Sequence, residues 1–327
     1  MKRFFSFLLS FCLCSSLSAQ DDGICAGVET RTSFRSSSDS FSIDYCALYA
    51  KGEIGREFTY YLYGYPNRFN RTPSYFDALS WGMLTWAPFE HLRLEMGKQM
   101  LEYAGNEYYY KPIDVFSPGE YWRNFSAFQL ALTGQYLTDG GDILSIQFGQ
   151  SPFRAQSTGK PLYSFSASAR GDHECFGYSA SVNFFEYADS RFTGHQALSG
   201  WAEFGPLKIE LDVINRTETS DPVLFKDYSV VGEAFLNLGA GFQLMAKYTK
   251  DRNANDSNSD SLVFAGADLN GLTGGVIWRP ESAGGKVRFH ALFSSVSGKQ
   301  SAFGGSMKTD DPYLDFGLTW DIKLINR

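Results

Sequence analysis

The sequence predicts an all-β protein, a transmembrane antiparallel β-barrel of about 16 strands, with a range of about 14 to 18. Three observations support this fold class. Segments of about ten residues alternate between apolar side chains and small or polar ones along most of the chain. The connections between these segments fall into a short class and a long class. Aromatic residues make up 17% of the 327 residues and glycine reaches 32, whereas long runs of helix-forming residues are missing.

The alternating pattern identifies the strands in order along the chain. In the last run, Leu314, Phe316 and Leu318 alternate with small or polar residues, so one face would be apolar and the other polar. The clearest runs lie at residues 41–49, 92–97, 128–133, 144–148, 176–184, 207–213, 242–248, 287–294 and 314–322. Less regular runs lie at residues 24–34, 53–64, 78–88, 196–205, 227–238 and 266–279.

The length of the connections discriminates between β folds. Short ones lie at residues 51–52, 88–90, 139–141, 171–172, 205–206, 238–239 and 280–285, and long polar ones at 65–77, 102–123, 151–161, 189–195, 217–226, 251–261 and 298–311. Short periplasmic turns and long external loops are typical of outer-membrane barrels. A lipid-embedded sheet must close on itself, because every backbone group needs a hydrogen-bond partner. A secreted soluble β-sandwich has strands of the same period and is the alternative fold.

The N-terminus has the features of a secretory signal peptide. Two basic residues precede an apolar run and then small residues, so we expect residues 1–19 to be removed by cleavage near Ala19. Residues 20–327 would then form a single barrel in the bacterial outer membrane, with outer-membrane lipid and the barrel assembly machinery as partners. The remaining cysteines, whose pairing is open, are Cys25, Cys46 and Cys175.

The charged residues exclude one class of partner and predict the lining of the barrel. With 29 Lys and Arg residues against 36 Asp and Glu residues, the net charge is −7, and no basic block is available to bind nucleic acid. Charges at inward strand positions would line a water-filled interior. The residues predicted there are Arg93, Glu95, Arg170, Lys208, Glu210, Asp212, Lys247, Arg279, Arg288 and Asp315. Ion selectivity and a lattice of salt bridges that stiffens the wall are both compatible with them.

The long connection at residues 102–123 is the candidate functional segment. It is rich in tyrosine, and Pro112, Pro118 and Gly119 make it too irregular for a regular helix or strand. Its candidate residues are Glu102, Glu107, Tyr109, Lys111, Asp114, Glu120 and Arg123. If this loop lines a constriction, its excess of carboxylates predicts that cations pass more readily than anions. The alternative is an external loop whose tyrosines cover the mouth of the barrel.

The segment that leads into this loop resembles a known family. Residues 92–118 are similar to a segment of porin-like outer-membrane proteins of diderm bacteria, in which a strand runs into a loop with glycine, aromatic residues and Pro-x-Asp. The match is carried by Gly97, Lys98, Gln99, Gly105, Pro112 and Asp114 and covers under a tenth of the chain. General and phosphate-selective porins are more distantly similar in strand layout. In general porins this loop folds into the barrel and narrows the channel, so the resemblance implies the same here.

The predicted function is that of an outer-membrane porin, a passive diffusion channel for small hydrophilic solutes or ions. A non-channel barrel, either structural or displaying its loops for adhesion, is the alternative. The sequence shows no nucleophile elbow, Cys/His pairing or zinc spacing, so we expect no enzymatic activity, metal or cofactor. His195 and His290 are the histidines that could in principle serve an outer-membrane enzyme. Whether the chain forms a homotrimer is left open.

Overall fold

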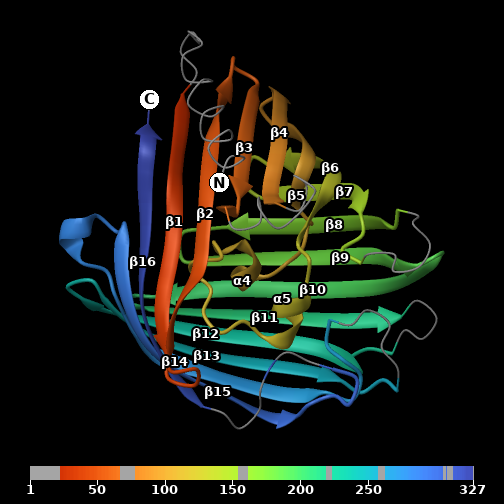
Figure 1. The fold of residues 1–327 in the computed structure, drawn as a ribbon. Helices are drawn as coiled ribbons and strands as arrows, with labels where there is room; N and C mark the ends of the chain where they lie inside the picture. The colour runs from red at the N-terminus through yellow and green to blue at the C-terminus, as the bar shows by residue number, and fades with distance from the viewer. Residues whose placement is uncertain are drawn as a thin grey trace.

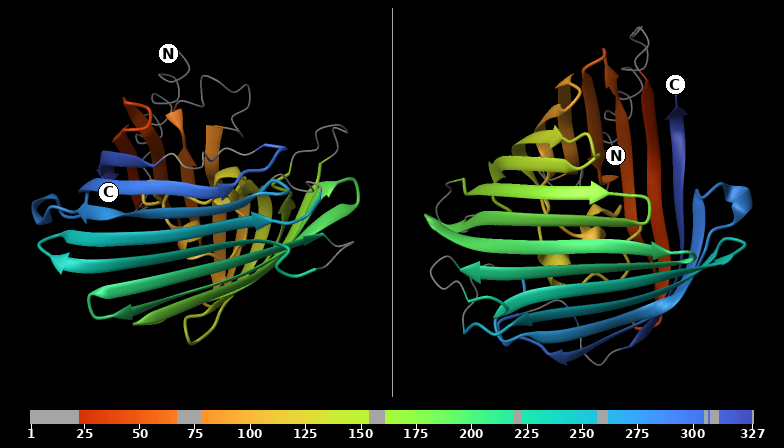
Figure 2. Two further views of the ribbon diagram at one scale, coloured as in Figure 1. Left: turned by 90° about the horizontal axis from the view of Figure 1, so that it is seen from below. Right: turned by 180° about the vertical axis from the view of Figure 1, so that it is seen from behind.

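The structure, a computed structural model, describes residues 23–66, 78–153, 161–218, 223–256, 262–304, 307 and 312–326. The predicted signal peptide, residues 1–19, lies outside this part of the chain. Sixteen strands of the described chain pair in sequence order, and β1 (Ile24–Arg35) pairs with β16 (Tyr313–Asn326), so the antiparallel sheet closes into a barrel. Figures 1 and 2 show this ring of strands from three directions. The predicted fold class is confirmed, and the β-sandwich alternative is wrong.

The strands between β1 and β16 follow the chain without a crossover. They are β2 (Ser40–Ile54), β3 (Phe58–Gly64), β4 (Leu79–Phe89), β5 (Leu92–Met100), β6 (Phe128–Leu137), β7 (Ile143–Gln150), β8 (Tyr163–Asp172), β9 (Phe176–Ala188), β10 (Arg191–Phe204), β11 (Leu207–Glu218), β12 (Asp227–Gly239), β13 (Phe242–Asn253), β14 (Asp268–Trp278) and β15 (Val287–Lys299). The connections hold the short helices α4 (Asn106–Tyr109), α5 (Glu120–Asn124) and η2 (Glu281–Ala283). Among the described residues, no helix has the length and apolar character needed to cross a membrane.

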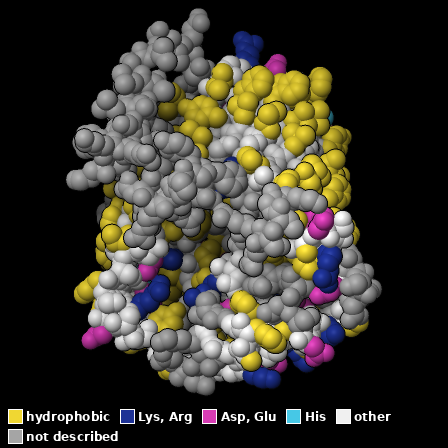
Figure 3. All heavy atoms as spheres, turned by 45° about the vertical axis from the view of Figure 1, so that its right-hand side comes forward, with side chains coloured by type: hydrophobic (Ala, Val, Ile, Leu, Met, Phe, Trp, Pro, Cys, Tyr) yellow, Lys and Arg dark blue, Asp and Glu magenta, His cyan; other side chains and the backbone are white. Residues whose placement is uncertain are grey.

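The barrel turns its apolar side chains outward, as β7 shows most clearly. Leu144, Ile146 and Phe148 are 47, 63 and 57% exposed, whereas Ser145 and Gln147 between them are buried. A water-soluble sheet would bury the apolar face, and here the polar face is the covered one. Figure 3 shows hydrophobic side chains gathered over a broad part of the outer surface. The exterior therefore suits contact with lipid.

The two ends of the barrel differ in their connections. Both chain ends of the sheet and the connections predicted to be short, such as residues 205–206 between β10 and β11, lie at one end, the short-turn end. The opposite end, the long-loop end, carries the connections predicted to be long. One of these predictions is wrong, because Asp189 and Ser190 alone join β9 to β10. The rest of the predicted loop at 189–195 continues the strand, and His195 is buried inside the barrel.

The connection between β5 and β6 lies inside the ring of strands. Figure 1 shows its two helices, α4 and α5, within the barrel. Tyr103 and Tyr121 from this connection pack in one buried cluster with Phe185 of β9 and Ile214 of β11. An apolar core of the protein therefore lies between this loop and the barrel wall.

We expect Gly97→Ala to destabilise the barrel. Gly97 in β5 has a φ of +119°, and a Cβ atom there would lie 2.2 Å from the carbonyl oxygen of Gly82 in β4. The expected loss is about 1–3 kcal/mol in the free energy of unfolding, measured by urea titration of the protein in lipid vesicles. Gly232→Ala is the matched control, because a Cβ there meets no described atom within 4 Å. Equal stability of the two variants would contradict this expectation.

Candidate functional site

The loop between β5 and β6 crosses the interior of the barrel from wall to wall. At one wall, the Asp212 carboxylate on β11 accepts a hydrogen bond from the backbone N–H of Asn106 (2.8 Å). At the other wall, the Lys111 ammonium forms ion pairs with Glu29 on β1 and, at 3.2 Å, with Asp321 on β16. Four strands, β12 to β15, separate these contacts along the sheet. The chain between the contacts therefore bridges the interior.

A buried cluster of charges fixes the first part of this crossing. The Lys247 ammonium on β13 lies 2.8 Å from the Glu107 carboxylate and 2.9 Å from that of Glu233 on β12. It also donates a hydrogen bond to the carbonyl of Phe116 (3.0 Å). Two buried carboxylates thus share one ammonium, which favours the protonated form of one of them. Burial raises the pKa of Glu107 to about 8, an effect that Lys247 opposes and Glu233 reinforces.

Arginines of the wall hold the second part of the crossing. Arg288 on β15 forms an ion pair with Asp114 and donates a hydrogen bond to the Ile113 carbonyl. Arg31 on β1 donates hydrogen bonds to the carbonyl oxygens of Ile113 (3.3 Å) and Val115 (2.7 Å). These guanidinium groups provide partners for backbone acceptors that lie away from regular structure. The path of this stretch is therefore set by residues of the barrel wall.

The α5 segment is attached to the wall through its backbone. Asp251 on β13 accepts hydrogen bonds from the N–H groups of Glu120 (2.7 Å) and Tyr121 (3.3 Å), which open the helix and have no partner within it. At the other end of α5, the Asn124 side chain donates to the Leu262 carbonyl (2.8 Å). The same Asn124 amide donates to the buried Glu120 carboxylate (3.0 Å). The Glu120 carboxylate therefore contributes to packing and lies away from water.

Two cavities meet at Phe116. The long-loop cavity, about 510 Å³, extends toward the long-loop end, where Ser37 and Tyr313 line it. The short-turn cavity, about 410 Å³, extends toward the opposite end, where Gly205 and Pro206 line it. Phe116 lines both cavities. This residue of the loop therefore lies between the two compartments of the interior.

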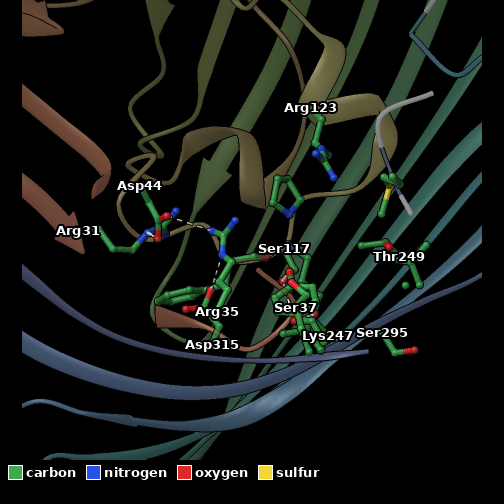
Figure 4. A pocket seen from close by; sticks show the side chains of 18 residues that line it. Arg31, Arg35, Ser37, Asp44, Ser117, Arg123, Lys247, Thr249, Ser295 and Asp315 are labelled. Atoms are coloured by element: carbon green, nitrogen blue, oxygen red, sulfur yellow. Dashed lines mark hydrogen bonds and ion pairs between the residues drawn. The ribbon is translucent and has the colours of Figure 1, made fainter. Parts of the chain in front are cut away.

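The long-loop cavity is lined by arginines from both the wall and the loop. Arg35 on β1 forms ion pairs with Asp44 on β2 (3.3 Å) and with Asp315 on β16 (3.4 Å). Arg31 lies 3.7 Å from the same Asp44 carboxylate. Arg123 extends from α5 toward this cavity, is exposed and forms no ion pair with any other described residue (Figure 4). Its guanidinium group is therefore open to water.

The other predicted site residues lie inside the barrel, and most have partners there. These pairs are Lys208 with Glu210 (2.9 Å), Arg170 with the centre of the Tyr109 ring (5.1 Å), Arg279 with Gln243 (2.9 Å) and Glu102 with Ser168 (2.7 Å). Arg93 and Glu95 lie on the same face of β5 as the buried Gln99. Most of the predicted interior charges thus contact a neighbouring side chain of the barrel or the loop.

Several residues that hold the loop or line the long-loop cavity are missing from the sequence-based prediction. They are Glu29, Arg31, Arg35, Asp44, Asp251 and Phe116. Glu29, Arg31 and Arg35 occupy alternate positions of β1, so the period-two pattern is a signal that could have found them. That pattern is weak in β1 because the positions between these charges are occupied by Thr30 and Thr32, which are not clearly apolar. Asp251 carries no local signal, because its loop partners lie 130 and 131 residues away.

The two histidines considered for catalysis pack against the loop. His290 Nε2 lies 3.3 Å from Asp315, and its ring centre lies 4.8 Å from that of Phe116. His195 Nδ1 lies 3.2 Å from the Tyr103 hydroxyl. In the part of the chain that the structure describes, no group of three His, Cys, Asp or Glu residues is arranged to hold a metal ion. The cysteines Cys25, Cys46 and Cys175 are free thiols.

Solved structures that resemble this chain are outer-membrane proteins. OmpT of Vibrio cholerae matches with a TM-score of 0.63 and 12% identity, over 94% of this chain and 99% of that chain. An anion-selective porin from Comamonas acidovorans matches with a TM-score of 0.63 and 11% identity, over 92 and 98%. Salmonella typhi OmpF matches with a TM-score of 0.63 and 10% identity, over 92 and 97%. No family model and no curated protein sequence matches the chain. The likeness establishes that the chain has the fold of outer-membrane porins.

We expect Glu107 to make the folded protein less stable as the pH rises. Its folded-state pKa lies above the ordinary value of 4.5, so the folded state holds this proton more tightly than the unfolded state does. The resulting stabilisation is complete below pH 4.5 and is lost as the pH rises through about 8. Glu107→Gln, which mimics the protonated carboxyl, should remove a pH dependence on the order of 3 kcal/mol from the free energy of unfolding.

Urea titrations between about pH 5 and pH 8 measure how steeply the free energy of unfolding falls with pH in wild type and in Glu107→Gln. The matched control is Glu174→Gln, a substitution in the exposed turn between β8 and β9. It should leave the pH dependence of wild type unchanged. If Glu107→Gln also kept the wild-type slope, the buried cluster would not hold the extra proton.

Proposed function

We propose that the protein is an outer-membrane porin, a passive diffusion channel for small hydrophilic solutes or ions. The observation that carries this proposal is the pair of polar cavities on the two sides of the loop, inside a closed barrel with an apolar exterior. Burying many charges in a dry interior is costly, whereas a water-filled interior keeps them solvated. The arginine-rich lining of the long-loop cavity therefore supports a wet passage.

Transport in this proposal needs no conformational cycle. A solute enters the long-loop cavity from outside the cell, passes the loop beside Phe116 and leaves through the short-turn cavity. The loop is attached to β1, β11, β13 and β15, so it acts as a stationary constriction. Selection then follows from the width of the passage and from the field of the charges that line it.

The same proposal places the chain in the bacterial outer membrane. Residues 1–19 would direct export and be removed near Ala19, and the barrel assembly machinery would insert the remaining chain into lipid. One of the similar structures is described as a trimer form of OmpT. A homotrimer is therefore part of the proposal, in which the outer wall of the barrel would make the contact between copies.

A non-channel barrel is the second candidate. The observation that favours it is the depth at which the loop is packed, because Ile113, Phe116 and Tyr121 are all buried. In that case the two cavities would be sealed from each other, and the interior charges would serve only to stiffen the barrel. Electrical recording separates the two candidates.

Purified protein in a planar lipid bilayer is expected to give stepwise current increments with a linear current–voltage relation. The physical reason is that each inserted barrel adds one water-filled path of fixed width. Folding is checked on the same sample by a change in gel migration on boiling. A folded, inserted protein that gives no current would contradict the channel proposal and favour the non-channel barrel.

Phe116→Ala should raise the single-channel conductance about twofold, because it removes the ring that lies between the two cavities. Phe125→Ala is the matched control. It removes the same ring from the buried cluster around Tyr103, away from both cavities. Wild-type conductance in Phe116→Ala, or an equal rise in both variants, would show that solutes do not pass beside Phe116.

A further inference from the structure

We propose that the long-loop cavity binds small anionic solutes, carboxylates or phosphates, and that this site makes the channel prefer anions. The inference rests on the proposed channel function and adds a solute class to it. It reverses the cation preference that the composition of the loop predicts. Arg123, Arg35 and Arg31 are the residues that would contact the solute.

The first step concerns the carboxylates of the loop, which are engaged elsewhere. The carboxyl groups of Glu107 and Asp114 contact Lys247 and Arg288 of the barrel wall. Glu102 accepts a hydrogen bond from a hydroxyl group on β8, and Glu120 is buried against its own helix. Among the described residues that line the cavity, the loop supplies Arg123 and none of these four carboxylates. The acidic composition of the loop therefore does not determine the charge of the cavity.

The second step concerns the cations that remain. Arg31 and Arg35 share the carboxylates of Asp44 and Asp315, and Arg123 has no ion pair among the described residues. Among the described residues that line the cavity, three guanidinium groups thus face two carboxylates. The ammonium group that also borders the cavity is already held by the two buried glutamates. The charge of the described lining is therefore positive on balance, which raises the local concentration of anions.

The third step concerns the neutral part of the lining. The hydroxyl-bearing residues Ser117 and Thr249 line the same cavity (Figure 4). Hydroxyls donate to carboxylate and phosphate oxygens, and a guanidinium group holds two such oxygens at once. A cavity of about 510 Å³ has room for a solute of several carbon atoms. The site is open to water and binds weakly, which suits a solute that must leave again.

Ion selectivity is measured first, by the reversal potential in an about tenfold gradient of KCl across a planar bilayer. Wild type is expected to favour chloride, and Arg123→Gln to lower the chloride-to-potassium permeability ratio at least about twofold. Arg56→Gln is the matched control, because it removes the same charge from the exposed turn between β2 and β3. It should keep the wild-type ratio. A wild-type channel that prefers potassium, or a ratio unchanged in Arg123→Gln, overturns the inference and leaves the channel function standing.

Binding is measured separately by calorimetry on folded protein in detergent, with citrate and inorganic phosphate as probes. This result does not depend on conductance. Arg123→Gln should weaken binding about tenfold, and Arg56→Gln should leave it unchanged. Citrate binding alone assigns the site to carboxylates, and phosphate binding alone assigns it to phosphates. If neither probe binds, the proposed anion site is wrong. If a probe binds to a protein that forms no conducting channel, the site is supported and the channel function is wrong.

Discussion

The pairing of β1 with β16 is the constraint on which the rest of the structure depends. Its register runs from Cys25 opposite Asn326 to Arg35 opposite Asp315, so the seam is paired along almost its whole length. Without this seam, the first and last strands would be open edges, which a lipid environment does not tolerate. The seam also creates a polar feature. It places Arg35 beside Asp315, 280 residues away in the sequence, at the wall of the long-loop cavity.

Closing 16 strands creates an interior that side chains of the wall alone do not fill. The loop between β5 and β6 occupies that space, and its irregular backbone needs hydrogen-bond partners there. Wall residues supply them: Asp212 and Asp251 accept from loop N–H groups, and Arg31 donates to loop carbonyls. The charges of the interior therefore have a structural role first. In the proposed channel, the charges that could act on a solute are those left over after these contacts are made.

The fold could be predicted from the sequence because the period-two pattern is local to each strand. The pattern failed at Asp189, where a polar stretch looks like a loop although it forms a tight turn and a strand whose His195 points inward. The site was harder to predict, because its contacts join distant parts of the chain. Asn106 and its partner Asp212 are 106 residues apart, and nothing near either residue marks the pairing. Side-chain type alone also cannot show whether a loop carboxylate faces water or an ion-pair partner.

The contacts around Phe116 make the loop between β5 and β6 a fixed part of the barrel and not a movable lid. Ser117 has a φ of 44°, a left-handed conformation that costs a residue with a side chain about 1–3 kcal/mol. Its hydroxyl bonds with Ser294 (2.8 Å) and Tyr313 (3.3 Å), while the preceding carbonyl, of Phe116, accepts from Lys247 (3.0 Å). Residues from β13, β15 and β16 thus hold two adjacent loop residues in a conformation that an unattached loop would leave. The space beside Phe116 can then change only if the strands themselves move. In the proposed channel, the limits on solute size and charge would follow from the geometry of the sheet.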